Sequence, residues 1–337
     1  MNNQEELLRI TSVYLADTIN YLDLTTATKE LKSLLEKIVG NDLNTDEGRE
    51  HITCDNGIAI GTYWAALCLD DFMRTRQFVR GIHEAMKDKL KLQQEPIHVM
   101  YAGTGPFATL LLPLILRYPK ESFRYTFMEI NQNTFNVLKT VTKGLGLDEY
   151  PINFVLADAS TYTIDKDDAP DIIISETMQN ALANEQQVPI FLNLMQQAKK
   201  ETIFIPEKIN IYIGLKQAEI PLLELNKSHY RKMNKLMEVS KETIADLTAV
   251  PTLPIEEQRF FEKRTTITKQ EQTGYKNLIL LTDIQTYKQE YLEITQSGLT
   301  LPRVLGYEMA HFNQPIDIYS YYKFGAKPQL VYEVTEQ

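Results

Sequence analysis

The sequence predicts an α/β protein in which helices wrap a parallel sheet, with a helical segment before the sheet and a β-rich domain after it. Apolar positions recur at helical spacing over residues 1–95, and apolar runs of strand length alternate with longer stretches over 96–205. Apolar and polar residues alternate over 206–337, as in half-buried antiparallel strands. With 337 residues, 43% hydrophobic and 24% charged, the chain has enough material for one large or two ordinary globular domains.

The first segment is expected to be helical, because its apolar residues follow a helical period at 7–22, 27–39 and 72–90. The parallel sheet is expected from four apolar runs, IHVMYA (97–102), YTFMEI (125–130), INFVLA (152–157) and DIIIS (171–175). Helices are expected between them at ATLLLPLILRY (108–118) and NTFNVLKTVTKGL (133–145).

The β-rich domain is expected from five alternating runs, IFIPEKINIYIGL (203–215), NLILLTDIQTY (277–287), QEYLEIT (289–295), IDIYSYYKF (316–324) and QLVYEV (329–334). A stretch at about 220–248 has a helical period instead, which predicts an inserted helical arm.

Composition and charge exclude several function classes. The formal net charge of −10 does not suggest a surface that binds nucleic acid, although it leaves local basic patches open, and it favours a cationic partner. Cys54 and Cys68 are too few for a disulfide framework, and neither they nor the five histidines show metal-ligand spacing, so we expect a reducing compartment and no metal. The chain shows no leader pattern and no apolar run near the ~18 residues of a membrane span, so we expect a cytoplasmic protein without a membrane partner.

The stretch VMYAGTGPFATL (99–110) fits the G-x-G-x-x-G/A fingerprint of a cofactor-binding turn. Gly103, Gly105 and Ala108 occupy its three small-residue positions, where the backbone turns tightly and approaches a ligand. Glu129 ends the next predicted strand, where an acidic side chain accepts hydrogen bonds from ribose hydroxyls. The alternative is a glycine turn that packs a helix against the sheet, with Glu129 merely solvated.

The turn does not choose the cofactor, because NAD and S-adenosylmethionine both carry an adenosine ribose. Asp158 and Ala159 end the third predicted strand, where a carboxylate and an adjacent N–H can bind the adenine amine and a ring nitrogen. No hydride-transfer His or Tyr–Lys pair follows, which also favours S-adenosylmethionine. Its carboxylate needs a cation, for which the helix at 72–90 offers Arg74, Arg76 and Arg80, although a solvated helix face also explains these arginines.

Two carboxylates follow the fourth predicted strand, in DIIISETMQNALANE (171–185). Glu176 stands at the C-terminal tip of the strand, where ligands bind in an open α/β sheet, and a hairpin would bring Glu185 beside it. Two adjacent carboxylates repel each other unless a cation lies between them, and a planar guanidinium can pair with both. Clamping the guanidinium would free one nitrogen to attack a methyl group. The residues alone are equally consistent with a lone strand-end acid and a Glu185 that begins a helix.

The segment SETMQNALANE (175–185) resembles the double-glutamate hairpin of the protein arginine methyltransferases, and other segments resemble that family in the same order. DFMRT (71–75) resembles the helix that caps the cofactor, IFIPEKINIYIGL (203–215) the strand that leads into the family's β-barrel, and AHFNQP (310–315) the Thr-His-Trp-Lys-Gln loop that closes the arginine pocket. The resemblance implies a class I methyltransferase fold: a Rossmann-like parallel sheet with an N-terminal helical segment and a C-terminal β-barrel-like domain.

The resemblance also implies roles for the matching residues. The catalytic residues would be Glu176, Glu185 and His311, and Met178 and Phe312 would line the substrate pocket. The residues that bind S-adenosyl-L-methionine would be Arg74, Gly103, Gly105, Glu129, Asp158, Ala159 and Glu176.

Three positions depart from the family pattern. Ala310 and Phe312 replace the usual threonine and tryptophan of the pocket loop, and Cys68 stands where a methionine helps to set the number of methyl groups added. The usual tyrosine pair of the capping helices is also absent.

These observations predict an S-adenosylmethionine-dependent N-methyltransferase that acts on a guanidinium of a protein, a peptide or a small guanidino compound. One alternative is methylation of an amine, hydroxyl or carboxyl in a small molecule or specialised peptide, which the altered pocket loop favours. Another is a non-catalytic S-adenosylmethionine-binding scaffold, against which the two retained glutamates argue. The stretch at about 220–248 lies where the family carries its dimerisation arm, so a homodimer is expected.

Overall fold

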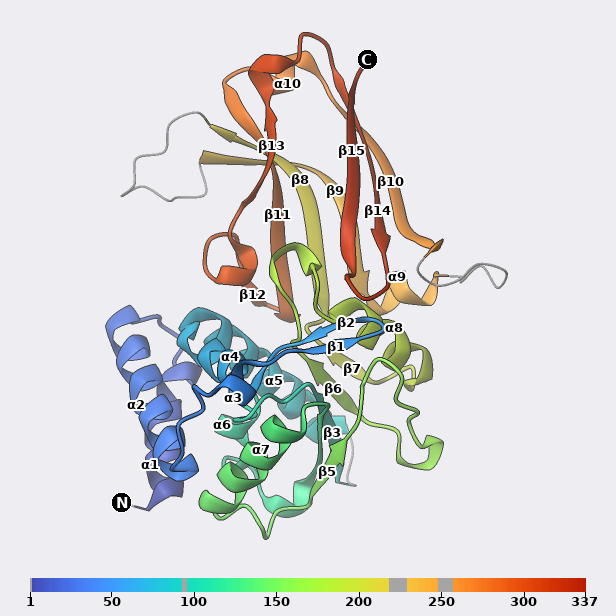
Figure 1. The fold of residues 1–337 in the computed structure, drawn as a ribbon. Coiled ribbons are helices and arrows are strands. Elements are labelled where there is room, and N and C mark those ends of the chain that lie inside the picture. Colours follow the sequence, from blue (N-terminus) through green and yellow to red (C-terminus); the bar gives the residue numbers. More distant parts are fainter. Residues whose placement is uncertain (1, 93–95, 218–228, 248–256) are drawn as a thin grey trace.

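The computed structural model describes residues 2–92, 96–217, 229–247 and 257–337, and it has a parallel-sheet domain from which an antiparallel domain extends (Figure 1). The parallel sheet has the strand order β5-β4-β3-β6-β7. Its strands are β3 (Ile97–Ala102), β4 (Phe123–Glu129), β5 (Ile152–Leu156), β6 (Ile172–Ser175) and β7 (Ile203–Ile205). Strands β3 and β6 are buried along their whole length, as continuous apolar runs in a sheet covered on both faces should be. The predicted fold class is confirmed.

Helical segments connect these strands. They are α6 (Leu112–Ile115), η3 (Lys120–Ser122), α7 (Gln132–Gly144), η4 (Lys166–Asp168), η5 (Asn180–Leu182) and α8 (Gln187–Gln197). Helix α7 matches its prediction and is capped by Asn131, whose side chain accepts hydrogen bonds from two backbone N–H groups. The prediction of a helix at 108–118 was wrong for most of that stretch. Only α6 forms there, because Ala108 has a φ of 43° and the chain turns before the helix can begin.

The N-terminal segment is helical, as predicted, and a short hairpin interrupts it. Its helices are α1 (Asn3–Thr11), η1 (Ser12–Leu15), α2 (Tyr21–Val39), α3 (Asp46–Arg49), α4 (Thr62–Leu67), η2 (Cys68–Asp70) and α5 (Phe72–Leu92). The antiparallel hairpin of β1 (Ile52–Cys54) and β2 (Gly57–Ala59) was not predicted. It crosses between the two domains (Figure 1).

The C-terminal domain contains two antiparallel sheets. One has the order β12-β11-β8-β9, with β13 also paired to β11, and the other has the order β10-β14-β15. Their strands are β8 (Lys208–Gln217), β9 (Tyr230–Ser240), β10 (Arg259–Ile267), β11 (Tyr275–Tyr287), β12 (Glu290–Leu292), β13 (Arg303–Glu308), β14 (Ile316–Lys323) and β15 (Gln329–Glu336). The short helices α9 (Lys241–Ala245), α10 (Lys269–Gln272), η8 (Gly298–Thr300) and η9 (Met309–His311) join them.

The prediction of a helical arm at about 220–248 was wrong for the residues of this stretch that the structure describes. Residues 230–240 form strand β9, which pairs with β8, and only the short α9 follows; residues 218–228 lie outside the described residues. The pairing contains two register shifts, so Leu236 and Met237 are both buried although they are neighbours. Together with Met233 they have the i, i+3, i+4 spacing of an apolar helix face. The basis for expecting a homodimer therefore does not hold for this stretch.

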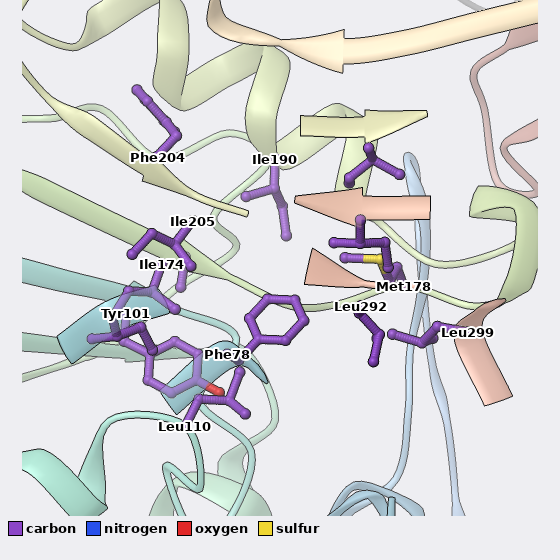
Figure 2. Packing of buried hydrophobic residues seen from close by; sticks show 14 of the residues in the cluster. Phe78, Tyr101, Leu110, Ile174, Met178, Ile190, Phe204, Ile205, Leu292 and Leu299 are labelled. Carbon is purple, nitrogen blue, oxygen red and sulfur yellow. The ribbon is translucent and has the colours of Figure 1, made fainter. Parts of the chain in front are cut away.

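A continuous hydrophobic core spans both domains and fixes their contact. Figure 2 shows Phe78 of α5, Tyr101 and Ile174 of the parallel sheet, and Leu292 and Leu299 of the C-terminal domain in this cluster. Within the described ranges, no helix is both long and apolar enough to cross a membrane.

Candidate active site

A cavity opens at the carboxyl ends of β3, β4 and β6, where ligands bind in open α/β sheets. It has about 800 Å³ of empty space, including its open mouth. Its lining residues come from segments between Ile58 and Ile190. The polar and glycine residues among its lining are Cys68, Arg74, Tyr101, Gly103, Thr104, Gly105, Thr109, Glu129, Thr134, Glu176, Thr177, Glu185 and Gln186.

The predicted glycine turn forms the floor of the cavity. Gly103 and Gly105 have φ values of 75° and 63°, which side chains rarely adopt. A Cβ atom on Gly103 would lie 2.3 Å from Cγ2 of Thr177, so this position also requires glycine for close packing. The turn is not followed by a helix N-terminus, because α6 begins only at Leu112. Its backbone N–H groups therefore donate hydrogen bonds to groups other than a ligand at a helix N-terminus.

One of these partners is Glu129, at the end of β4. Its Oε2 accepts a hydrogen bond from Gly105 N at 3.0 Å, and its Oε1 accepts from Ile130 N at 2.9 Å and Asn131 N at 3.0 Å. Burial raises the pKa of Glu129, and these three N–H groups offset part of the rise. A carboxylate can accept about four hydrogen bonds, so capacity remains for a hydroxyl in the cavity.

Asp158 and Ala159 differ in their position relative to the cavity. Ala159 lines the cavity, whereas Asp158 accepts hydrogen bonds from Ser160 N at 2.8 Å and from Nε2 of Gln186 at 3.3 Å. Gln186 itself lines the cavity. The carboxylate of Asp158 thus holds a wall residue in place, and its expected contact with adenine stays a prediction.

Of the three arginines on α5, only Arg74 lines the cavity. Arg76 donates to Ala16 O and Arg80 pairs with Glu290, so these two tie the N-terminal segment and β12 to the helix. Arg74 is buried, and its Nη1 lies 3.0 Å from Oε2 of Glu176. Neither Nε of Arg74 nor Oε1 of Glu176 has a hydrogen-bond partner within the described residues.

The loop from 176 to 185 brings both predicted glutamates to the same cavity. Three residues of the loop that are not glycine, Ala181, Leu182 and Asn184, have φ values of 57°, 55° and 62°, so the backbone is tightly folded. Contacts from distant elements hold it in this shape. Ile58 N donates to Asn184 O at 2.9 Å, and the Tyr322 hydroxyl donates to Leu182 O at 2.8 Å.

The two carboxylates of this loop share a single arginine among the cavity's lining residues. Burial raises the pKa of Glu176 to about 7, although Arg74 opposes the rise. Burial and the neighbouring charge of Glu176 raise the pKa of Glu185 to about 8. Arg74 can neutralise only one of the two carboxylates, so a second cation in the cavity would let both ionise.

Cys68 also lines the cavity, and burial is the main cause of the raised pKa of its thiol. Its charge environment includes Arg74, Glu176 and Glu185. The position that the resemblance assigned to a methionine is thus part of the cavity wall.

Three predicted residues lie elsewhere. Met178 is buried in the hydrophobic core, where Figure 2 shows it with Leu292 and Leu299, and it does not line the cavity. His311 and Phe312 belong to η9 and its C-terminal cap, and the His311 side chain is exposed. They follow Glu308, which pairs with Asn277 of β11.

The opposite end of β11 contacts the cavity's own helix, because Thr286 donates to Gln77 O of α5 at 2.9 Å. At about 3.4 Å per residue, Asn277 and Thr286 lie roughly 30 Å apart along the strand. The placement of His311 and Phe312 at the pocket was therefore wrong, and His311 is not a candidate catalytic residue.

A different loop covers the hairpin, and the sequence did not reveal it. Ser297 Oγ and Gly298 N donate to Oδ2 of Asp71 at 2.6 and 3.0 Å, and Asn180 Nδ2 donates to Leu301 O at 2.6 Å. The one local signal is that Ser297 caps η8 by accepting a hydrogen bond from Leu299 N. The partners lie far apart along the chain, so periodicity could not connect them.

Comparison with solved structures identifies the fold. PRMT1 of Trypanosoma brucei, solved as an enzyme–prozyme heterotetrameric complex with AdoHcy, is 14% identical and matches 80% of this chain and 92% of its own with a TM-score of 0.52. Protein arginine methyltransferase 10 of Arabidopsis thaliana, solved in an open conformation, is 11% identical and matches the same shares with a TM-score of 0.53. No family model matches the chain, and no curated protein sequence matches it. The chain shares the fold of these two proteins, a Rossmann-like methyltransferase domain followed by a β-barrel-like domain.

Proposed function

We propose that this protein transfers a methyl group from S-adenosylmethionine to a guanidinium nitrogen of arginine. The observation that carries the proposal is the pair Glu176 and Glu185, two buried carboxylates in one cavity with a single arginine to neutralise them. The shared fold with arginine methyltransferases and the AdoHcy of one of them support the choice of cofactor.

The cavity residues fit S-adenosylmethionine better than NAD. Arg74 Nε and Thr104 Oγ1 are buried polar atoms without partners in the described part of the chain, and Arg74 would bind the cofactor's carboxylate. Glu129 would bind the ribose, with Ile130 and Ala159 at the apolar wall. A dinucleotide needs a helix N-terminus at the glycine turn for its pyrophosphate, and the four-residue α6 does not provide one.

The bound cofactor supplies an electrophilic methyl group on a sulfonium. The protein's part is to hold the acceptor. Glu176 and Glu185 would pair with the guanidinium, fix one nitrogen in line with the methyl carbon and exclude water. That nitrogen would form a bond to the methyl carbon while the carbon–sulfur bond breaks and neutral AdoHcy leaves, and the methylated guanidinium would then lose a proton. A carboxylate with a raised pKa, such as Glu185, accepts a proton more readily than an exposed one.

The raised pKa values also argue against a non-catalytic scaffold. Two buried carboxylates whose ionisation is suppressed destabilise the folded protein at neutral pH and above. An idle binding protein would be more stable with neutral residues at these positions. Function explains why both acids are present.

The proposal is tested by methyl transfer from labelled S-adenosylmethionine to an arginine peptide. Glu176→Gln and Glu185→Gln should lower kcat at least 100-fold while AdoHcy still binds in a calorimetric titration. Glu333→Gln, an exposed residue of β15, is the matched control and should behave as the wild type. Wild-type turnover in either cavity variant, or tight binding of NADH by the wild type, would contradict the proposal.

Two accompanying predictions have no support from the described residues: a cytoplasmic location and assembly as a homodimer. They stay predictions.

A further inference from the structure

The two carboxylates of the candidate clamp have partners of different kinds. Glu176 pairs with the buried cation of Arg74, whereas the carboxylate of Glu185 receives a hydrogen bond from the neutral side chain of Gln179. Gln179 is exposed, and it lines a groove on the outer side of the loop from 176 to 185, not the cavity itself. A residue outside the cavity thus contacts one of the two acids inside it.

The carboxamide of Gln179 bridges two successive residues at the end of the loop. Its Oε1 accepts a hydrogen bond from Nδ2 of Asn184 at 3.0 Å. An ionised carboxylate can only accept, so Nε2 of Gln179 is the donor in the bond to Glu185. Glutamine suits this position because its acceptor and its donor are attached to the same carbon atom. Methionine could make neither bond, and glutamate could keep only the bond to Asn184.

Asn184 anchors this bridge to two other parts of the fold. Its backbone N–H donates to Pro328 O at 2.7 Å, and its backbone O accepts from Ile58 N at 2.9 Å. Its φ of 62° is one that asparagine adopts more readily than most residues. Because Asn184 immediately precedes Glu185, the bridge ties the carboxylate to a segment whose backbone is held on both sides.

The groups that act on the charge of Glu185 come from several elements. Among the described residues they are Glu176 after β6, Arg74 of α5 and the thiol of Cys68 in η2. Burial and Glu176 raise the pKa of Glu185, whereas Arg74 and the hydrogen bond from Gln179 lower it. A guanidinium pairs most strongly with an ionised carboxylate. A donor that favours the ionised form of Glu185 therefore favours the clamp.

We infer that Gln179 is a positioning residue: its carboxamide, held by Asn184, orients the carboxylate of Glu185 toward the acceptor and stabilises its negative charge. The inference rests on the proposed function and adds to it a residue outside the cavity on which the clamp depends. The role requires no contact between Gln179 and the substrate, since it acts through Glu185.

The pH profile of kcat/KM for an arginine peptide separates this role from a merely structural one. In Gln179→Met the limb that reports ionisation of Glu185 should move to higher pH by about 0.5–1 unit, because the donor is lost. Below that limb kcat/KM should fall about 3–10-fold, and the loss should shrink toward the alkaline end, where Glu185 is ionised in both proteins. In Gln179→Glu the shift should be larger, since a negative charge replaces the donor. Gln329→Met, at an exposed residue that lines the same groove, is the matched control and should keep the wild-type profile.

A second measurement does not depend on activity. The NMR chemical shift of the Glu185 carboxyl carbon, assigned by its absence in Glu185→Gln, should titrate at higher pH in ligand-free Gln179→Met than in the wild type. An unchanged titration in both Gln179 variants, or a loss of kcat/KM by the same factor at every pH, would overturn the inference, while methylation of the peptide would leave the proposed function standing. A shifted titration without methyl transfer to any guanidinium would overturn the proposed function and leave Gln179 as the residue that positions Glu185.

Discussion

Replacing Glu185 by glutamine should stabilise the ligand-free protein, and the gain should grow with pH. The carboxyl has a pKa near 4.5 when exposed and about 8 in the folded protein, because it is buried beside Glu176. The folded state therefore keeps this proton while the unfolded chain has already lost it. Folded stability due to the protonated carboxyl is fully present below pH 4.5 and is lost as the pH rises through 8.

The size of the effect follows from the two pKa values. Between pH 6 and pH 9 the wild type should lose about 3 kcal/mol of unfolding free energy through Glu185 alone. Glutamine has nearly the same shape and no charge, so the variant avoids this loss. The difference in unfolding free energy, variant minus wild type, should therefore increase by about 3 kcal/mol over that range.

The assay is urea unfolding of ligand-free protein at pH 6, 7.5 and 9, followed by circular dichroism. Glu333→Gln on the exposed surface of β15 serves as the control, and its difference from the wild type should stay constant. A difference for Glu185→Gln that is also constant, or that shrinks as the pH rises, would refute the argument that this carboxylate is buried beside a like charge.

Three further changes test the arrangement around the hairpin. Arg74→Gln leaves Glu176 without its buried partner, so the unfolding free energy should fall by about 3 kcal/mol at pH 8. The loss should be smaller at pH 6, where Glu176 is protonated. Equal losses in denaturant titrations at both pH values would be inconsistent with the ion pair. Gly103→Ala should lower the unfolding free energy by about 1–3 kcal/mol in thermal unfolding. Adding Thr177→Ser should restore part of this loss, because it removes the Cγ2 atom that the new Cβ meets. If stability is not restored, backbone strain alone is responsible. Tyr322→Phe should lose about 1 kcal/mol by calorimetry, because it removes the hydroxyl that donates to the hairpin loop; an unchanged melting temperature would count against that contact.

Strands β3, β4 and β6 of the parallel sheet were predictable because nearly all of their residues are buried. The three isoleucines of β6 form an uninterrupted apolar run, and Glu176 follows the end of that strand just as Glu129 stands at the end of β4. Glu129, Glu176 and the glycine turn sit at strand ends, so the sheet itself brings them together. The prediction that Arg74 belongs to the site depended on the family resemblance, because nothing in the local sequence distinguishes Arg74 from Arg76 and Arg80.

Other features depend on contacts that the sequence does not express locally. An apolar run such as ATLLLPLILRY has no period that separates a helix from buried turns, and nothing in the run indicates the positive φ of Ala108. In β9 the register shifts gave a strand the pattern of a helix. The pocket loop was misplaced because AHFNQP is a loose match, whereas the loop at 297–301 is held by Asp71 and Asn180 from distant parts of the chain.

The central claim is that the two glutamates clamp a guanidinium that receives the methyl group. The most direct measurement is tandem mass spectrometry of an arginine peptide after reaction with isotopically labelled S-adenosylmethionine, using the wild type, Glu185→Gln and Glu333→Gln. Our account predicts the label on a guanidinium nitrogen with the wild type and the control variant, and none with Glu185→Gln. Label on a hydroxyl, carboxyl or amine, or equal label on guanidinium with all three proteins, would contradict it.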